Sequence, residues 1–188
     1  MSVVFTPQRR KLSADQFERM GQTGILGPDA RVELIEGELI EMAPIGSRHA
    51  AAVDFLSMHF ARLVGDAALV RTQNPLRLAD DSEPQPDLML LRPRADRYRS
   101  AHPRPADVLL LIEVAETTLV FDRETKLPLY AKHGVPEVWI LDLDARRLEI
   151  HREPGEGGYR RKLERGEAES IAPMALPAAA LQVGAVFA

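Results

Sequence analysis

The feature that most constrains the fold is an almost unbroken apolar run, Val108-Leu-Leu-Leu-Ile-Glu-Val114. An apolar run without alternation is typical of a strand that is covered on both faces. A sheet with such a central strand needs covering layers, which helices commonly supply. The run therefore predicts a fold that mixes strands and helices, and it places one carboxylate, Glu113, inside the apolar segment.

Three segments have the patterns of helices. Residues 13–16 have the form of a capping box, which predicts a short helix that ends near residue 20. Apolar residues recur at helical spacing over residues 47–64, so this segment is expected to be the main helix. A third helix is expected to begin at Asp122 or Thr125 and to reach His133.

Short apolar or alternating runs predict the strands, and two of them flank Glu36-Gly37, a pair that suggests a hairpin turn. The expected strands are residues 32–36, 38–42, 68–72, 76–78, 88–91, 108–114, 138–141 and 147–151, with a last hairpin arm near Tyr159. With the helices, these strands predict an α/β fold.

Composition narrows the class of protein. The chain has 188 residues, 45% of them hydrophobic, a formal net charge of −4 and no cysteine. No repeat or linker divides it, so we expect one domain over residues 1–188. The absence of cysteine excludes a disulfide framework, a thiolate metal site and a cysteine nucleophile, and it is compatible with a reducing compartment. The acidic balance argues against a basic coat for non-specific nucleic-acid binding, although it allows a local basic groove.

Neither a membrane span nor a signal peptide is expected. The apolar stretch at residues 108–112 is far shorter than the roughly 18 residues that cross a bilayer. The N-terminus has its basic residues after a short apolar piece rather than before a long one. We therefore expect a cytoplasmic protein with no membrane partner.

Two carboxylates are candidates for a site. Glu113 is costly to bury unless it is paired, protonated or bound to a cation, or else the strand ends there and Glu113 faces water. Asp87 follows a proline at the entrance of the preceding strand, and taken alone it is an ordinary turn residue. If both strands end in carboxylates, the two like charges lie close together and one must take up a proton unless a cation is bound. Mg²⁺, with its oxygen ligands, would resolve that conflict.

One lysine and one arginine-rich segment are also candidates for a functional role. Lys126 is one of only 4 lysines among 24 basic residues, and it follows the strand that carries Glu113. It either serves the site or is a solvated lysine paired with Asp122 four residues earlier. The segment 92–104 carries a strong positive charge. This charge has three alternative interpretations: the segment binds a phosphate backbone, it is a solvated loop, or it contacts a partner subunit. Its arginines are Arg92, Arg94, Arg97, Arg99 and Arg104.

Several short motifs follow one another from about Leu12 to Tyr159. They are Val32-Glu-Leu-Ile-Glu-Gly-Glu38, the segment from Pro44 to His49, Gln85-Pro-Asp87, Leu111-Ile-Glu-Val114, Asp122…Lys126…Tyr130 and Gly134-Val-Pro-Glu-Val-Trp-Ile-Leu-Asp142. In this order they resemble a large family of restriction-endonuclease-like proteins that is expanded in cyanobacteria and belongs to the PD-(D/E)XK nuclease superfamily. The resemblance implies a restriction-endonuclease-like core, a mixed β-sheet flanked by helices, with an N-terminal β-hairpin extension. The tail after Glu164 adds no recognisable motif.

The resemblance also implies roles for particular residues. Asp87 would be the first catalytic acid and Glu113 the second. The superfamily's usual lysine position holds Ala115, and Lys126 on the following helix would be the counterpart of that lysine. The implied reaction is hydrolysis of DNA phosphodiester bonds, with Mg²⁺, or Mn²⁺ as the alternative ion, held by Asp87, Glu113 and the backbone carbonyl of Val114.

Two further residues match family positions and are assigned supporting roles. They are Glu33, in the predicted hairpin, and His49, at the start of the main helix. His49 either contacts phosphate or makes a local hydrogen bond.

Three functions compete on this sequence. The first is a metal-dependent DNA endonuclease, favoured by the intact set of Asp87, Glu113 and Lys126. The second is a catalytically weak or inactive nuclease-fold module that binds nucleic acid or a protein partner. The third is a homodimerisation domain with apolar patches near Trp139 or the C-terminus. A double-strand cut needs two active sites or two visits, so a homodimer is also compatible with the first function.

Overall fold

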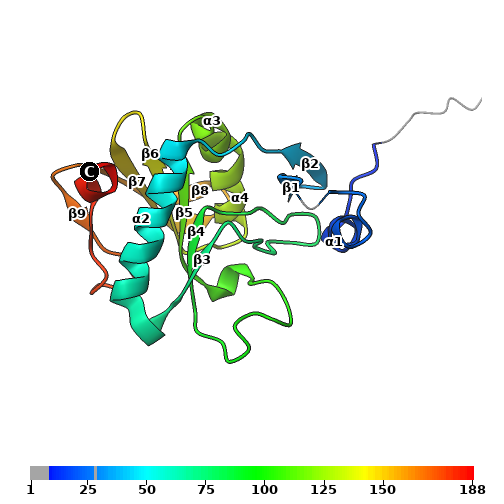
Figure 1. The fold of residues 1–188 in the computed structure, drawn as a ribbon, viewed down its shortest axis with the longest axis horizontal. Helices are drawn as coiled ribbons and strands as arrows, with labels where there is room; N and C mark the ends of the chain where they lie inside the picture. The colour runs from blue at the N-terminus through cyan, green and yellow to red at the C-terminus, as the bar shows by residue number, and fades with distance from the viewer. Residues whose placement is uncertain (1–8, 28) are drawn as a thin grey trace, which may run out of the picture.

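A six-stranded mixed sheet forms the centre of the computed structural model, which describes residues 9–27 and 29–188 (Figure 1). Its strands, in spatial order, are β3 (Leu69–Thr72), β4 (Leu88–Leu91), β5 (Val108–Ala115), β6 (Glu137–Asp142), β7 (Arg147–Gly155) and β8 (Gly158–Gly166). Only β5 and β6 pair in parallel, and every other neighbouring pair is antiparallel. The predicted class, a mixed sheet flanked by helices, is confirmed.

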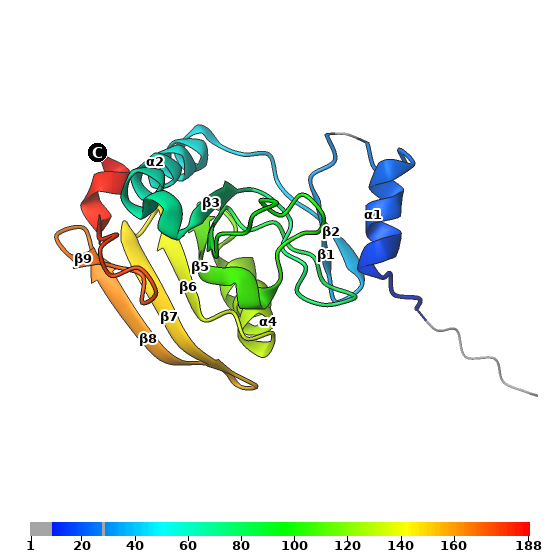
Figure 2. The same cartoon turned by 90° about the horizontal axis from the view of Figure 1, so that it is seen from below.

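The strand β5 is buried along its whole length, as its apolar run predicts. Its side chains alternate between two cores. Leu110 and Ile112 pack in the core that contains α2 (Ser47–Val64), whereas Leu111 packs in the core that contains α4 (Leu127–Lys132). Figure 2 shows α2 and α4 on opposite faces of the sheet. Glu113 has the same parity as Leu111, so its side chain lies on the face that α4 covers.

The helix before α4 begins earlier than expected. A turn of α-helix, α3 (Leu119–Phe121), precedes Asp122 and is followed by a π-helical turn over Asp122–Lys126. Within this turn the Leu127 N–H bonds to the carbonyl of Asp122, five residues back. The wider turn leads into Pro128, which has no N–H and therefore cannot bond back to residue 124. The predicted starts at Asp122 and Thr125 are wrong because the helix absorbs this proline instead of starting late.

Residues 76–78 were also expected to form a strand and do not. Leu76 and Leu78 are buried, yet their N–H groups bond to the carbonyls of Pro84 and Ser82 within a long loop. The apolar spacing of Leu76 and Leu78 reflects their burial. Their backbone N–H groups bond within the loop and not to a neighbouring strand.

The predicted N-terminal hairpin is present outside the main sheet. Strands β1 (Val32–Ile35) and β2 (Glu38–Glu41) form their own two-stranded sheet. The turn residues Glu36 and Gly37 both have positive φ, 47° and 82°, as a type I′ turn requires. The helix α1 (Ala14–Gln22) begins at the predicted capping box of Ser13 and packs against this hairpin (Figure 2).

The C-terminal segment is fastened to the sheet by Glu137, which is fully buried at the start of β6. The Glu137 carboxylate accepts hydrogen bonds from Trp139 Nε1 at 2.8 Å, Arg152 Nε at 2.8 Å and the Met174 N–H at 2.7 Å. Beyond it, β9 (Ser170–Ile171) pairs with β10 (Leu181–Gln182). One buried carboxylate therefore links the tail to the core.

Replacing Glu137 with Ala is expected to lower the free energy of unfolding by about 3–5 kcal/mol, because the buried guanidinium of Arg152 loses its counter-charge. Urea titration followed by Trp139 fluorescence measures this change. The same substitution at Glu164, whose side chain is 48% exposed, should cost no more than about 1 kcal/mol. Equal losses for the two variants would contradict the anchoring role.

None of the helices in the described part of the chain is long and apolar enough to cross a membrane.

Candidate active site

Asp87 and Glu113 meet at one edge of the sheet. Asp87 directly precedes β4, and Leu88 pairs with Ile112, so the strand register places the two acids side by side. The Asp87 N–H lies 3.4 Å from Glu113 Oε2, and Asp87 Oδ2 accepts the Val114 N–H at 2.8 Å. The expected juxtaposition of two carboxylates is therefore present.

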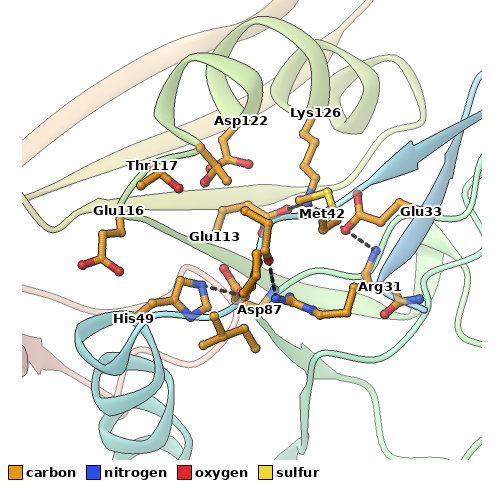
Figure 3. A pocket seen from close by; sticks show the side chains of 16 residues that line it. Arg31, Glu33, Met42, His49, Asp87, Glu113, Glu116, Thr117, Asp122 and Lys126 are labelled. Carbon is orange, nitrogen blue, oxygen red and sulfur yellow. Dashed lines mark hydrogen bonds and ion pairs between the residues drawn. The ribbon is translucent and has the colours of Figure 1, made fainter. Parts of the chain in front are cut away.

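Lys126 points into the sheet and is only 2% exposed. Its Nζ lies 3.3 Å from Glu113 Oε1 and 3.1 Å from Glu33 Oε1 (Figure 3). The surface pair with Asp122 is not what the structure shows. The ammonium is buried between two carboxylates, one from the central strand and one from the hairpin.

Tyr130 completes the surroundings of Glu113. It lies four residues after Lys126, on the same side of the helix, and its hydroxyl donates to Glu113 Oε1 at 2.6 Å. Both helix residues thus contact one oxygen of Glu113 and leave Oε2 on the side of Asp87. Tyr130 appeared in the sequence only as part of a motif, and its spacing from Lys126 was the signal that could have identified it.

Glu33 and His49, the two supporting candidates, both reach the site. Glu33 is 2% exposed, and its Oε1 also accepts the Gln85 N–H at 3.1 Å. His49 Nε2 lies 3.1 Å from Asp87 Oδ1. His49 does not make the local hydrogen bond that was the alternative for a residue at the start of a helix. Both His49 and Glu33 instead contact segments that are far away in the sequence.

These side chains line a cavity of about 60 Å³ between the hairpin, the start of α2 and the π-helical turn. Arg31, Asp122 and the segment 42–46 complete its walls. An open groove of about 510 Å³ shares Glu33 and Asp87 with this cavity, and Gln73 and Asp29 help to line it. Asp122, which the sequence suggested as a helix cap or a surface partner of Lys126, contributes a further buried carboxylate, and its Oδ2 accepts the Thr118 hydroxyl at 2.6 Å.

The crowding of charges shifts several pKa values. Burial raises the pKa of Glu113 to about 8; Lys126 opposes this shift, and the carboxylates of Asp122 and Asp87 reinforce it. Burial disfavours the charged form of Lys126, yet the carboxylates, led by Glu113 and Glu33, raise its pKa above the usual value. Burial likewise raises the pKa of Asp122. Without a metal, the site therefore holds more protons than its groups would hold in water.

His49 adds to this proton uptake. Its hydrogen bond to Asp87 raises the pKa of the imidazole, against the opposing effect of burial. A cation that bound Asp87 would compete with the protonated imidazole for the same carboxylate.

The donor set fits a hard divalent cation. Asp87 and Glu113 offer oxygen ligands, and the N–H and C=O of a strand residue point to the same side, so the Val114 carbonyl also faces Asp87. Glu33 Oε2 is a buried carboxylate oxygen without a hydrogen-bond partner among the described residues. Excess buried negative charge of this kind is what a cation would neutralise.

The arginine segment lies away from this cavity. Asp87 precedes the first residue of β4 and Arg92 follows the last, so the length of the strand separates them. Arg94 pairs with Asp96 instead of standing free. The exposed arginines of the segment are Arg92, Arg97, Arg99 and Arg104. Their contact with DNA stays a prediction.

A second group of possible metal ligands occurs within residues 9–27 and 29–188. Glu18, Glu83 and His102 place ligand atoms within 4.8 Å of one another. The guanidinium of Arg77 lies 2.9 Å from Glu18 and 3.5 Å from Glu83 and already neutralises part of their charge. This group ties α1 to the loops beside it and shares no residue with the cavity.

Comparison with known proteins agrees with this architecture. A crystal structure described as "a putative nuclease belonging to DUF820", from Anabaena variabilis, superposes with a TM-score of 0.71 at 16% sequence identity. The alignment covers 94% of this chain and 97% of that chain, and at this identity it shows a shared fold. Curated proteins show no significant similarity to this chain. The model of the Uma2 family, described as "Putative restriction endonuclease", matches residues 14–184. The chain therefore belongs to the Uma2 family of restriction-endonuclease-like proteins.

Proposed function

We propose that this protein is a metal-dependent endonuclease that hydrolyses DNA phosphodiester bonds. The observation that carries the proposal is the pair of Asp87 and the buried Glu113, held in register at neighbouring strand ends with Lys126 Nζ 3.3 Å from Glu113. Two carboxylates and an ammonium at one cavity are the groups that phosphodiester hydrolysis requires, namely a place for a cation and a positive charge near the phosphate.

Asp87, Glu113 and the Val114 carbonyl would hold Mg²⁺, with Mn²⁺ as the alternative ion. When bound, the ion supplies a Lewis acid for the phosphate and lowers the pKa of a coordinated water. The two hydrogen bonds that fix these ligands come from the chain itself. The Val114 N–H orients Asp87, and the Tyr130 hydroxyl orients Glu113.

Lys126 would stabilise the negative charge that grows on the phosphate. Its burial removes the screening of water, which strengthens the effect of one positive charge. His49 would support Asp87 through the contact at 3.1 Å. These roles make the whole chain one nuclease-like domain, which we propose to be cytoplasmic because it has no cysteine.

The experiment is a cleavage assay on supercoiled, linear, single-stranded and branched DNA with Mg²⁺ or Mn²⁺. Thermal unfolding with increasing ion concentration accompanies it, because an ion that binds only the folded chain raises the melting temperature. Cleavage together with a thermal shift supports the proposal. A thermal shift and DNA binding without cleavage would favour the inactive binding module, and the absence of both effects would contradict a metal site. Sedimentation with and without DNA tests whether a homodimer forms.

The arginine segment gives a separate prediction on DNA affinity. Replacing Arg97 and Arg99 with Gln is expected to weaken binding and to reduce the slope of log K against log salt by about 0.9 for each lost phosphate contact. Fluorescence anisotropy at several salt concentrations, with Ca²⁺ in place of Mg²⁺, measures the slope. The exposed Arg62, on α2, provides the control substitution. If the slope is unchanged, the segment faces solvent or a protein partner.

A further inference from the structure

One carboxylate oxygen of the site, Glu33 Oε2, has no role in the proposed function. Glu33 is 98% buried, since its exposed fraction is 2%. Its Oε1 accepts hydrogen bonds from Lys126 Nζ and the Gln85 N–H, whereas Oε2 has no partner among the described residues. A buried carboxylate oxygen without a donor is costly, so its retention calls for a donor that the apo chain does not supply.

Glu33 stands where such a donor would arrive. It lines both the cavity and the open groove, and Figure 3 shows its side chain beside Lys126. Glu113 lines the cavity but not the groove. Glu33 therefore borders both spaces.

The two proposed ion ligands, Asp87 and Glu113, have partners. Asp87 accepts the Val114 N–H at Oδ2 and contacts His49 at Oδ1. Glu113 Oε1 accepts the Tyr130 hydroxyl and pairs with Lys126.

Asp122 and Lys126 also have partners. Asp122 Oδ2 accepts the Thr118 hydroxyl. The ammonium of Lys126, placed between two carboxylates, has donors only and cannot accept a proton.

We propose that Glu33 Oε2 accepts the proton of the water that attacks the phosphate, so that Glu33 is a catalytic residue as well as the partner of Lys126. This inference rests on the proposed hydrolysis. The water O–H bond breaks, its proton passes to Glu33 Oε2, and its oxygen forms the new bond to phosphorus. The bond from phosphorus to the leaving oxygen breaks, and that oxygen keeps the electron pair and takes a proton from solvent. Glu33 then returns its proton to solvent.

Glu33 has a competing role as a ligand of a second cation, and the two roles differ in what they predict for ion binding. A proton acceptor changes the chemical step alone, whereas a ligand changes the number or affinity of bound ions. The decisive measurement is therefore kinetics combined with calorimetric titration of Mn²⁺.

The test variant is Glu33→Gln, which keeps the size of the side chain and an acceptor for Lys126. We expect kcat to fall roughly 100- to 10,000-fold, the range for loss of a general base, with KM and the number of bound Mn²⁺ ions unchanged. Glu36→Gln is the matched control on the same hairpin, since Glu36 pairs with Lys132 at the surface. The control should keep the wild-type kcat.

Three results separate the possibilities. A Glu33→Gln variant with wild-type kcat, or one that binds fewer Mn²⁺ ions, overturns the inference. If Glu33→Gln does not fold, Glu33→Asp decides, because its shortened carboxylate should keep the ion count and lower kcat at least about 10-fold, and an unchanged kcat overturns the inference. A wild-type protein that cleaves no DNA would instead refute the proposed function on which the inference rests.

Discussion

Replacing Asp87 with Asn is expected to lower the rate of metal-dependent DNA cleavage at least about 1,000-fold, since several kcal/mol of transition-state stabilisation depend on the bound cation. The thermal shift on adding Mg²⁺ or Mn²⁺ should disappear as well. Asn is the suitable replacement because its side-chain oxygen can still accept the Val114 N–H, which Asp87 accepts at 2.8 Å. An Ala at this position would leave that N–H without a partner.

The stability of the Asp87→Asn variant distinguishes a ligand from a structural residue. In metal-free buffer above pH 8, where Glu113 is ionised, its melting temperature should equal or exceed that of the wild type, because repulsion between Asp87 and Glu113 is relieved. Asp54→Asn, an exposed change on α2, is the control and should leave both cleavage and ion binding intact. A lower metal-free melting temperature together with a preserved ion-induced shift would identify Asp87 as structural.

Replacing Lys126 with Met is expected to lower the cleavage rate at least about 100-fold, the scale of losing one positioned charge-stabilising group. Ion binding should persist, because Asp87 and Glu113 remain. The metal-free fold should lose about 3–5 kcal/mol above pH 8, where the buried, ionised Glu113 loses the counter-charge that it shares with Glu33. Cleavage kinetics, calorimetry and urea titrations measure these three effects.

The stability loss in Lys126→Met should depend on pH. Burial already raises the pKa of Glu113 to about 8 with Lys126 present, and removal of Lys126 raises this pKa further. A carboxyl group whose pKa is raised in the folded chain holds a proton that the unfolded chain has released. Stability therefore falls as pH rises from the ordinary carboxyl pKa through the folded value. The variant should be close to wild type near pH 4.5 and furthest from it above pH 8.

The control is Lys132→Met, six residues along the same helical segment. The Lys132 side chain is 59% exposed and pairs with Glu36 at the surface. It should keep the wild-type cleavage rate and lose no more than about 1 kcal/mol of stability. A Lys126→Met variant that cleaves DNA normally would refute the role of Lys126.

The elements that were predictable from sequence are those with a local physical signal. The apolar run at 108–114 indicated a strand covered on both faces. The interruption at Glu113 indicated either a compensated buried carboxylate or the end of the strand, and the structure shows the buried carboxylate. The Ser13 capping box and the Glu36-Gly37 turn are local backbone chemistry, and both were confirmed. The proximity of Asp87 to Glu113 followed once the two strands were taken as neighbours.

What could not be predicted depends on contacts between distant residues. Glu33 and Lys126 are 93 positions apart, and no local pattern specifies that the hairpin meets the helix. The start of the helix was wrong because a π-helical turn accommodates Pro128, a solution that periodicity does not reveal. The strand at 76–78 was wrong because buried leucines also occur in loops whose hydrogen bonds are local.

The hairpin that carries Glu33 shares no ladder with the main sheet. Its docking depends on the Leu34–Glu83 bridge, on Ile35, which packs in the core that contains α4, on α1 and on the Lys126–Glu33 pair. A unit attached in this way can open without global unfolding, at a free energy that amide hydrogen exchange reports. Each opening removes one wall of the site and exposes the buried ammonium. The fraction of molecules able to cleave DNA would then be set by the local opening equilibrium of β1 and β2. Moderate denaturant should therefore abolish the proposed cleavage activity while the six-stranded sheet stays folded.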